Sequence, residues 1–209
     1  QQANAQAAQA QEDAPRPPWR EVALWVGLSA TASTLLLALT RHLTQDVAPV
    51  PFLWVLPLAL YLLSFILCFD APRYYVRPAF LAALPLALLA LDRVMDGGLD
   101  VPWLVALLCG ALFVCCMVCH GELVRRKPAL RHLTLFYLML SVGGALGGLF
   151  VGLLAPVAFN AYFELPIGLW ACALLVVCAV WAEAGRRAPR WGRGLLVLAL
   201  LLYGPRLAS

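Results

Sequence analysis

The stretch VPWLVALLCGALFVCCMVC, Val101–Cys119, contains no Asp, Glu, Lys, Arg or His. A helix needs about 20 mostly apolar residues to cross the hydrocarbon core of a bilayer. Directly after it comes HGELVRRK, His120–Lys127, in which charged side chains appear abruptly. The run and its basic flank predict a helix that crosses a membrane and ends on the side where positive residues gather.

The composition of the whole chain favours the same environment. Of 209 residues, 63% are hydrophobic and 12% are charged, and the mean hydropathy is +0.85. Globular domains have about 45–50% apolar and about 25% charged residues. A net charge of +4 in so apolar a chain is a weak sign of nucleic-acid binding, and we expect no nucleic-acid partner. The lipid bilayer is the first partner that the composition predicts.

Uncharged runs recur along the chain and predict an all-α integral membrane protein. The last run is too short to span without its flanks, so the prediction is a bundle of six to seven transmembrane helices. In order, the runs are Val22–Thr40, Val47–Phe69, Pro78–Leu91, Val101–Cys119, Leu133–Phe159, Leu165–Ala182 and Gly194–Pro205.

The basic residues predict the orientation of this bundle. If the N-terminus is cytoplasmic and the helices alternate, twelve of the 15 basic residues fall on the cytoplasmic side. The three that fall outside are Arg41, Arg93 and Arg206. Such an excess is the positive-inside signal, which predicts a multi-pass protein of the inner (cytoplasmic) membrane.

Residues 1–18 form a region of different composition. They are rich in Ala, Gln and Pro and contain no apolar run, which is typical of a disordered linker or leader. Residues 19–209 form the predicted transmembrane domain. We expect the chain to be part of a longer protein.

Cys116, Cys119 and His120 spell C-x-x-C-H, the pattern that attaches a c-type haem. In the predicted topology the pattern ends a continuous apolar helix on the cytoplasmic side, whereas haem attachment takes place on the opposite side. The seven cysteines lie in apolar runs, where free thiols pack as small hydrophobic groups. We therefore expect packed thiols, no metal and no cofactor, with a haem-binding redox subunit as the competing hypothesis.

Polar residues gather at both predicted surfaces. On the outer side, a speculative ligand site for a polar or cationic solute comprises His42, Gln45, Asp46, Asn160 and Glu164. The simpler interpretation is that these residues cap helix ends and connect loops. On the inner side, a possible ion-paired cluster comprises His120, Glu122, Arg131, His132, Asp70 and Arg73. Lipid headgroups or topology determination would involve Arg125, Arg126, Lys127 and Arg131.

The stretch SVGGALGGLFVG predicts a close helix contact. Gly144, Gly148 and Gly152 recur every four residues, and Gly143 and Gly147 recur beside them. Glycines at this spacing let another backbone approach closely. We expect Gly148→Leu to damage packing far more than Cys116→Ser.

Two blocks carry a resemblance to a known family: HLTQDVAPVPFLWVLPLALYLLSFILCFD and CHGELVRRKPALRHLTLFYLMLSVGGALGGLF. They resemble the membrane region of spermidine-synthase-like integral membrane proteins, of the fused major-facilitator/spermidine synthase type. The resemblance implies a membrane region joined to a Rossmann-like aminopropyltransferase domain. This sequence has no strand–glycine-rich–helix unit, so the family's catalytic residues have no positions here.

Two functions of different classes follow. The first is a non-catalytic membrane module of a spermidine-synthase-like protein, which acts as scaffold, anchor or accessory subunit for other membrane subunits or for the rest of its own chain. The alternative is a transporter-like half that moves a small polar or cationic, polyamine-like solute. We assign no catalytic residues, and the sequence leaves open whether the whole protein is an enzyme.

The topology gives a first testable prediction. An epitope tag next to Arg126 should be inaccessible to antibody in intact spheroplasts, whereas a tag between Gly97 and Gly98 should be accessible, because the two loops flank the same helix. Antibody binding before and after permeabilisation of the spheroplasts measures this. Access to the Arg126 tag in intact spheroplasts would contradict the orientation.

Overall fold

The computed structural model describes residues 16–46, 52–70, 72–95, 100–158 and 164–184. Within these ranges every regular element is helical, which confirms the predicted all-α fold. The long helices are α2 (Trp19–Asp46), α3 (Val55–Asp70), α4 (Arg77–Met95), α5 (Val101–Arg125), α6 (Leu133–Leu149) and α8 (Glu164–Ala184). The short elements are the 3₁₀ turns η1 (Pro72–Tyr74) and η2 (Leu130–His132), the π-helical turn η3 (Phe150–Leu154) and α7 (Ala155–Ala158).

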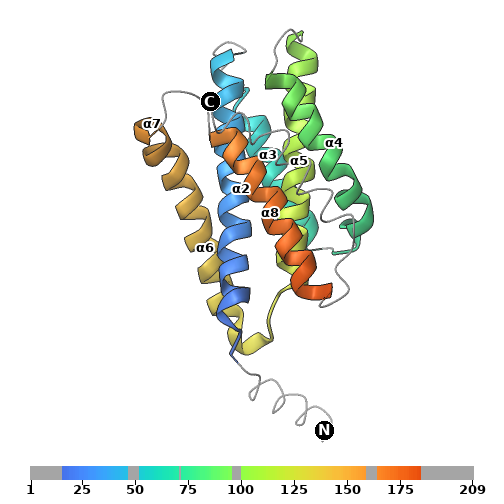
Figure 1. Ribbon diagram of the computed structural model, residues 1–209, viewed down its shortest axis with the longest axis vertical. Coiled ribbons are helices and arrows are strands. Elements are labelled where there is room, and N and C mark those ends of the chain that lie inside the picture. The colour runs from blue at the N-terminus through green and yellow to red at the C-terminus, as the bar shows by residue number, and fades with distance from the viewer. Residues whose placement is uncertain (1–15, 47–51, 71, 96–99, 159–163, 185–209) are drawn as a thin grey trace, which may run out of the picture.

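Successive long helices alternate in direction (Figure 1). The start of α2 and the ends of α3, α5 and α8 lie together at the lower end of the bundle, with η1 and η2. Because this end carries the connections rich in Arg and Lys, we call it the basic end. The number of spans and their orientation in a membrane remain predictions.

Three helices are long and apolar enough to cross a membrane: Trp19–Thr44, Val101–Arg125 and Leu130–Val157. Three shorter helices are also apolar: Val55–Asp70, Arg77–Leu91 and Ile167–Val180. All six coincide with runs expected from the sequence. The seventh run, Gly194–Pro205, and most of the predicted linker lie outside the described residues.

The centre of the bundle is α2, which packs against α3, α5, α6 and α8. Its buried side chains recur at helical spacing: Trp25, Leu28, Ala32, Leu35, Leu39 and Leu43. The Trp25 ring meets Phe136 of α6 edge to face, with ring centroids 5.1 Å apart. The buried face of α2 is therefore one part of a core to which α4, α5, α6 and α8 also contribute.

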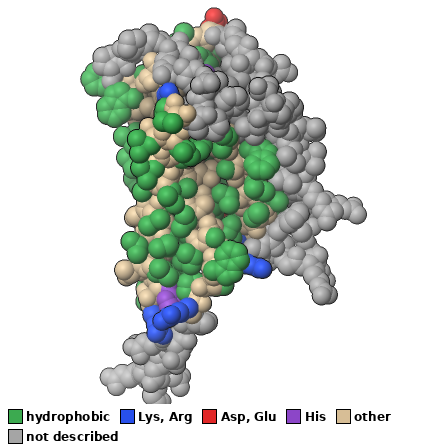
Figure 2. Space-filling model, turned by 60° about the vertical axis from the view of Figure 1, so that its left-hand side comes forward, with side chains coloured by type: hydrophobic (Ala, Val, Ile, Leu, Met, Phe, Trp, Pro, Cys, Tyr) green, Lys and Arg blue, Asp and Glu red, His purple; other side chains and the backbone are tan. Residues whose placement is uncertain are grey.

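The outward faces of the bundle are also apolar. Large side chains such as Leu86, Ile66 and Leu138 are exposed on α4, α3 and α6. Figure 2 shows apolar side chains covering the middle of one face, with Lys and Arg mostly at its lower end. Apolar surface of this extent is typical of proteins whose surroundings are lipid or other subunits.

The closest helix contact is between α2 and α6, and it is made at Gly143 and Gly147. A Cβ atom on Gly143 would lie 2.5 Å from the Val26 carbonyl oxygen, and one on Gly147 would collide with the Ala30 carbonyl oxygen. A Cβ on Gly144 or Gly148 would meet only ordinary contacts at 3.8 Å, and one on Gly152 would meet no atom within 4 Å.

The glycines at the contact are thus Gly143 and Gly147, one position before the predicted stripe Gly144, Gly148 and Gly152. The sequence contains two glycine registers one residue apart, and a shift of one residue turns a helix by about 100°. Two hydroxyls fix the register that is used. Ser29 donates a hydrogen bond to the Leu140 carbonyl (2.7 Å) and Ser33 donates one to the Gly144 carbonyl (3.0 Å).

Gly147→Ala should therefore destabilise the bundle, and Gly152→Ala should not. The new methyl group at residue 147 meets backbone, which cannot move aside as a side chain does, so we expect a cost of at least about 1–3 kcal/mol. Thermal unfolding of both variants in detergent measures the difference. Equal stability of the two variants would contradict this assignment of the α2–α6 contact.

Candidate functional site

Two ionisable residues are fully buried near the end of α5. His120 is 1% exposed and Glu122 is 0% exposed. An ionisable side chain in an apolar helix is costly unless it is paired, and it is by default the first place to look for function. The bundle therefore has a polar site at its basic end.

Glu122 is the anchor of this site. Arg77, at the start of α4, donates to both carboxylate oxygens: Nε to Oε1 at 2.8 Å and Nη2 to Oε2 at 3.1 Å. Tyr75 donates its hydroxyl to Oε1 at 3.1 Å. A two-pronged Arg–carboxylate pair of this kind fixes orientation as well as charge. It joins α5 to the start of α4.

Tyr75 fits here because its neighbour on α5 has no side chain. A Cβ on Gly121 would lie 2.5 Å from the Tyr75 ring. Burial, and then the negative charge and hydrogen bond of Glu122, raise the pKa of Tyr75. The phenol therefore keeps its proton and remains a donor to the carboxylate.

His120 forms the second half of the site, toward α3. Its Nδ1 lies 3.0 Å from the Ser64 hydroxyl oxygen, and Ser64 donates its proton to the Tyr61 carbonyl at 2.7 Å. The rings of Tyr61 and Phe65 meet the imidazole edge to face at 5.0 and 5.3 Å. These contacts hold the imidazole of α5 against α3.

Arg126 joins three helices at the same end. Its Nη1 donates to Glu21 of α2 at 3.0 and 3.1 Å, and its Nη2 donates to the Ala179 carbonyl of α8. Its own carbonyl accepts from Trp25 Nε1 at 3.2 Å. Its side chain is 9% exposed.

These contacts correct the prediction that Arg126 contacts lipid headgroups. The guanidinium points into the bundle because Glu21 and an α8 carbonyl offer it partners there. The side chains of Arg125, Lys127 and Arg131, predicted for the same role, are exposed.

The expected inner cluster is also only partly correct. Glu122 pairs with Arg77, whereas Asp70 is exposed. Arg73 lies against Tyr74, with its Nη2 3.4 Å from the Tyr74 hydroxyl. The short segment Tyr75–Arg77, directly before α4, supplies both partners of Glu122. The sequence signal is a tyrosine and an arginine two residues apart at a helix start, a pattern too common to identify alone.

The C-x-x-C-H residues lie in unbroken helix, and all three are buried. The Cys119 sulfur lies 3.8 Å from that of Cys172 on α8, and the Cys68 thiol contacts the Met117 carbonyl at 3.7 Å. The cysteines of the described ranges are free, and these ranges contain no group of three His, Cys, Asp or Glu arranged for a metal ion. This arrangement favours packed thiols.

The speculative outer site remains a prediction. Gln45 and Asp46 end α2, and Glu164 begins α8, so both segments lie at the end of the bundle opposite the basic end (Figure 1). Their side chains, and all of Asn160, lie outside what the structure describes. His42 is half-buried in the last turns of α2.

No protein-family model matches this chain, and comparison with curated proteins and with solved structures finds no match either.

The Arg77–Glu122 pair gives a testable prediction. Arg77→Gln leaves the fully buried Glu122 carboxylate without its counter-charge and should cost about 3–5 kcal/mol of stability. Glu122→Gln should cost less, because the Arg77 side chain is 22% exposed. The double variant should recover part of that loss. Thermal unfolding in detergent tests this, with exposed Asp70→Asn as the neutral control. Losses that simply add in the double variant would show that the two residues do not act as a pair.

Proposed function

We propose that this chain is a non-catalytic, membrane-integral module that anchors or scaffolds a larger assembly in the cytoplasmic membrane. The single observation that carries the proposal is that three buried ionisable side chains at the basic end, Glu122, His120 and Arg126, each join α5 to other helices. Glu122 ties α5 to α4, His120 ties α5 to α3, and Arg126 ties α5 to α2 and α8.

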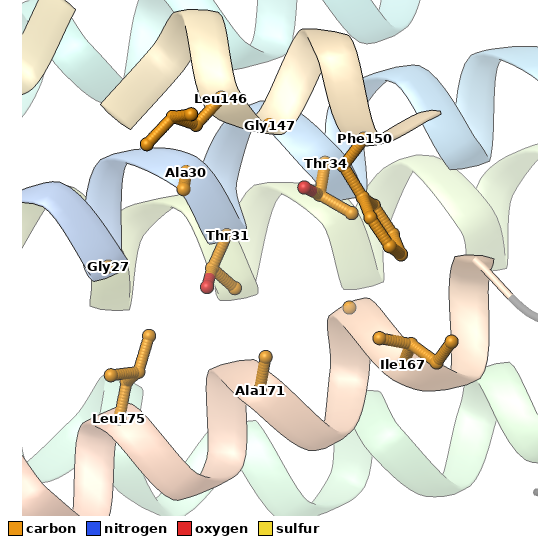
Figure 3. A pocket seen from close by; sticks show the side chains of 11 residues that line it. Gly27, Ala30, Thr31, Thr34, Leu146, Gly147, Phe150, Ile167, Ala171 and Leu175 are labelled. Atoms are coloured by element: carbon orange, nitrogen blue, oxygen red, sulfur yellow. The ribbon is translucent and has the colours of Figure 1, made fainter. Parts of the chain in front are cut away.

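The grooves of the described bundle support the same proposal. One groove of about 270 Å³ opens between α2, α6 and α8. Figure 3 shows Phe150 pointing from η3 toward Ile167 of α8, with the side chains of Thr31 and Thr34 alongside. The rest of its lining is apolar: Gly27, Ala30, Leu146, Gly147, Phe150, Ile167, Gly168, Ala171 and Leu175.

A second groove of about 470 Å³ follows the outer side of η3. Its lining is entirely apolar: Leu146, Leu149, Phe150, Leu153, Leu154 and Val157. Transport of a polar solute depends on carbonyl, hydroxyl or charged groups along the path. Apart from Thr31 and Thr34 in the first groove, the walls of both grooves are apolar. Such walls suit lipid chains or apolar helices better, and so favour the module over the transporter alternative.

The finer form of the proposal is that the assembly is of the spermidine-synthase-like type. Its support is the resemblance of the two sequence blocks, which together contain α3, α6 and the ends of α2 and α5. The partner would then be an aminopropyltransferase-like domain, on the same polypeptide or on another.

Native mass spectrometry of the complex extracted from membranes with mild detergent tests this function. We expect the chain's sequence to be recovered in a species heavier than the 22.7 kDa of the chain, either as part of a longer polypeptide or with a stoichiometric partner. Recovery as an isolated polypeptide of this mass would contradict the scaffold role.

A second arm addresses transport. Proteoliposomes that contain the purified chain should take up radiolabelled spermidine no faster than protein-free liposomes, and Asp46→Asn with Glu164→Gln should change nothing. Uptake that these two substitutions abolish would overturn the proposal in favour of the transporter.

A further inference from the structure

The exposed cations of the basic end form a surface distinct from the buried site. They lie just before α2 and on its first turn, on η1, at the end of α5 and on the α5–α6 connection. We call them the cationic rim: Arg16, Arg20, Arg73, Arg125, Lys127 and Arg131. We propose that the cationic rim is a docking surface for the headgroups of anionic phospholipids. The inference rests on the membrane placement in the proposed function and adds the kind of lipid.

The described side chains on the surface of this end are mostly positively charged. Glu21 and Glu122 are engaged by Arg126 and Arg77, whose guanidinium groups point into the bundle. Their charges are therefore satisfied inside the structure. At this end, the exposed charged side chains that the structure describes are these six cations and one acid, Asp70. The rim has the positive charge that an anionic surface attracts, at about 1 kcal/mol per residue.

Three of these cations lie against aromatic rings. The Arg20 guanidinium lies 5.8 Å from the Trp19 ring, that of Arg73 lies 5.2 Å from the Tyr74 ring, and the Lys127 ammonium lies 5.9 Å from the Tyr137 ring. Each ring is itself exposed, by 74, 50 and 42%. Exposed Trp and Tyr rings settle at the level of lipid headgroups, and a cation over such a ring is kept at that level.

The positions of these cation–aromatic pairs suit a lipid surface better than a single free anion. The three cation–aromatic pairs belong to α2, to η1 and to the α5–α6 hairpin, so they are spread around the end of the bundle. A single phosphate needs donors that converge on one point, whereas a leaflet presents many phosphates in one plane. Figure 2 shows Lys and Arg side chains at the lower end, next to the apolar side chains of the middle. This arrangement matches headgroups above hydrocarbon.

The test uses the whole chain in nanodiscs of phosphatidylcholine mixed with phosphatidylglycerol. Native mass spectrometry counts the lipids that remain bound after release. The wild type should retain phosphatidylglycerol in preference to phosphatidylcholine. The triple variant Arg20→Gln, Arg73→Gln and Lys127→Gln should lose about fivefold or more of that preference, since one such cation is worth about that factor. Arg41→Gln, at the other end of α2, should keep it.

A charge-conserving variant, Arg20→Lys with Arg73→Lys, should also keep the preference, so a loss caused by misfolding is recognised. Equal retention of both lipids by the wild type, or an unchanged preference in the triple variant, would overturn the docking surface. So would inorganic phosphate that, in pure phosphatidylcholine discs, raises the unfolding temperature as much as phosphatidylglycerol does.

The same preparation keeps this inference separate from the proposed function. A chain that inserts into phosphatidylcholine discs but shows no lipid preference overturns the docking surface alone. A chain that stays dispersed in buffer without lipid or detergent contradicts the membrane module itself.

Discussion

The cost of burying polar groups in an apolar bundle is the constraint on which this structure depends. A polar group that leaves water is stable when it has a partner within the protein, because apolar surroundings offer none. Backbone groups meet this demand through helices. The few buried side chains meet it by crossing between helices, as Ser29 does to the Leu140 carbonyl and Glu122 does to Arg77. The polar contacts between helices are therefore few, and each connects particular elements.

These contacts fall into two sets with different tasks. Along the α2–α6 contact, glycines and serine hydroxyls bring two backbones together, with Gly143 and Gly147 supplying space and Ser29 and Ser33 supplying hydrogen bonds. At the basic end, the end of α5 gathers α2, α3, α4 and α8 through charged and hydroxyl groups. Close van der Waals contact thus holds α2 against α6, whereas charged and hydrogen-bonded groups hold the end of α5 against the other helices.

The cations of the basic end divide in the same way. Arg77 and Arg126 neutralise carboxylates inside the bundle, whereas Arg20, Arg73 and Lys127 lie outside against aromatic rings. All five count equally in a tally of positive residues that predicts topology. In the structure, the first two hold the helices together and the other three face the surroundings. One excess of positive charge therefore has two physical consequences.

The sequence by itself determined the helical class, the places of the helices and the polar character of the end of α5, because apolar run length and charge position are local properties of a chain in lipid. Only the tertiary structure decided that Gly143 and Gly147 face α2, that Glu122 pairs with Arg77, and that Arg126 points into the bundle. Each of these depends on how a helix is rotated about its axis. A nearly uniform apolar surface carries little periodic signal for rotation, so that angle is set by contacts between residues far apart in the chain.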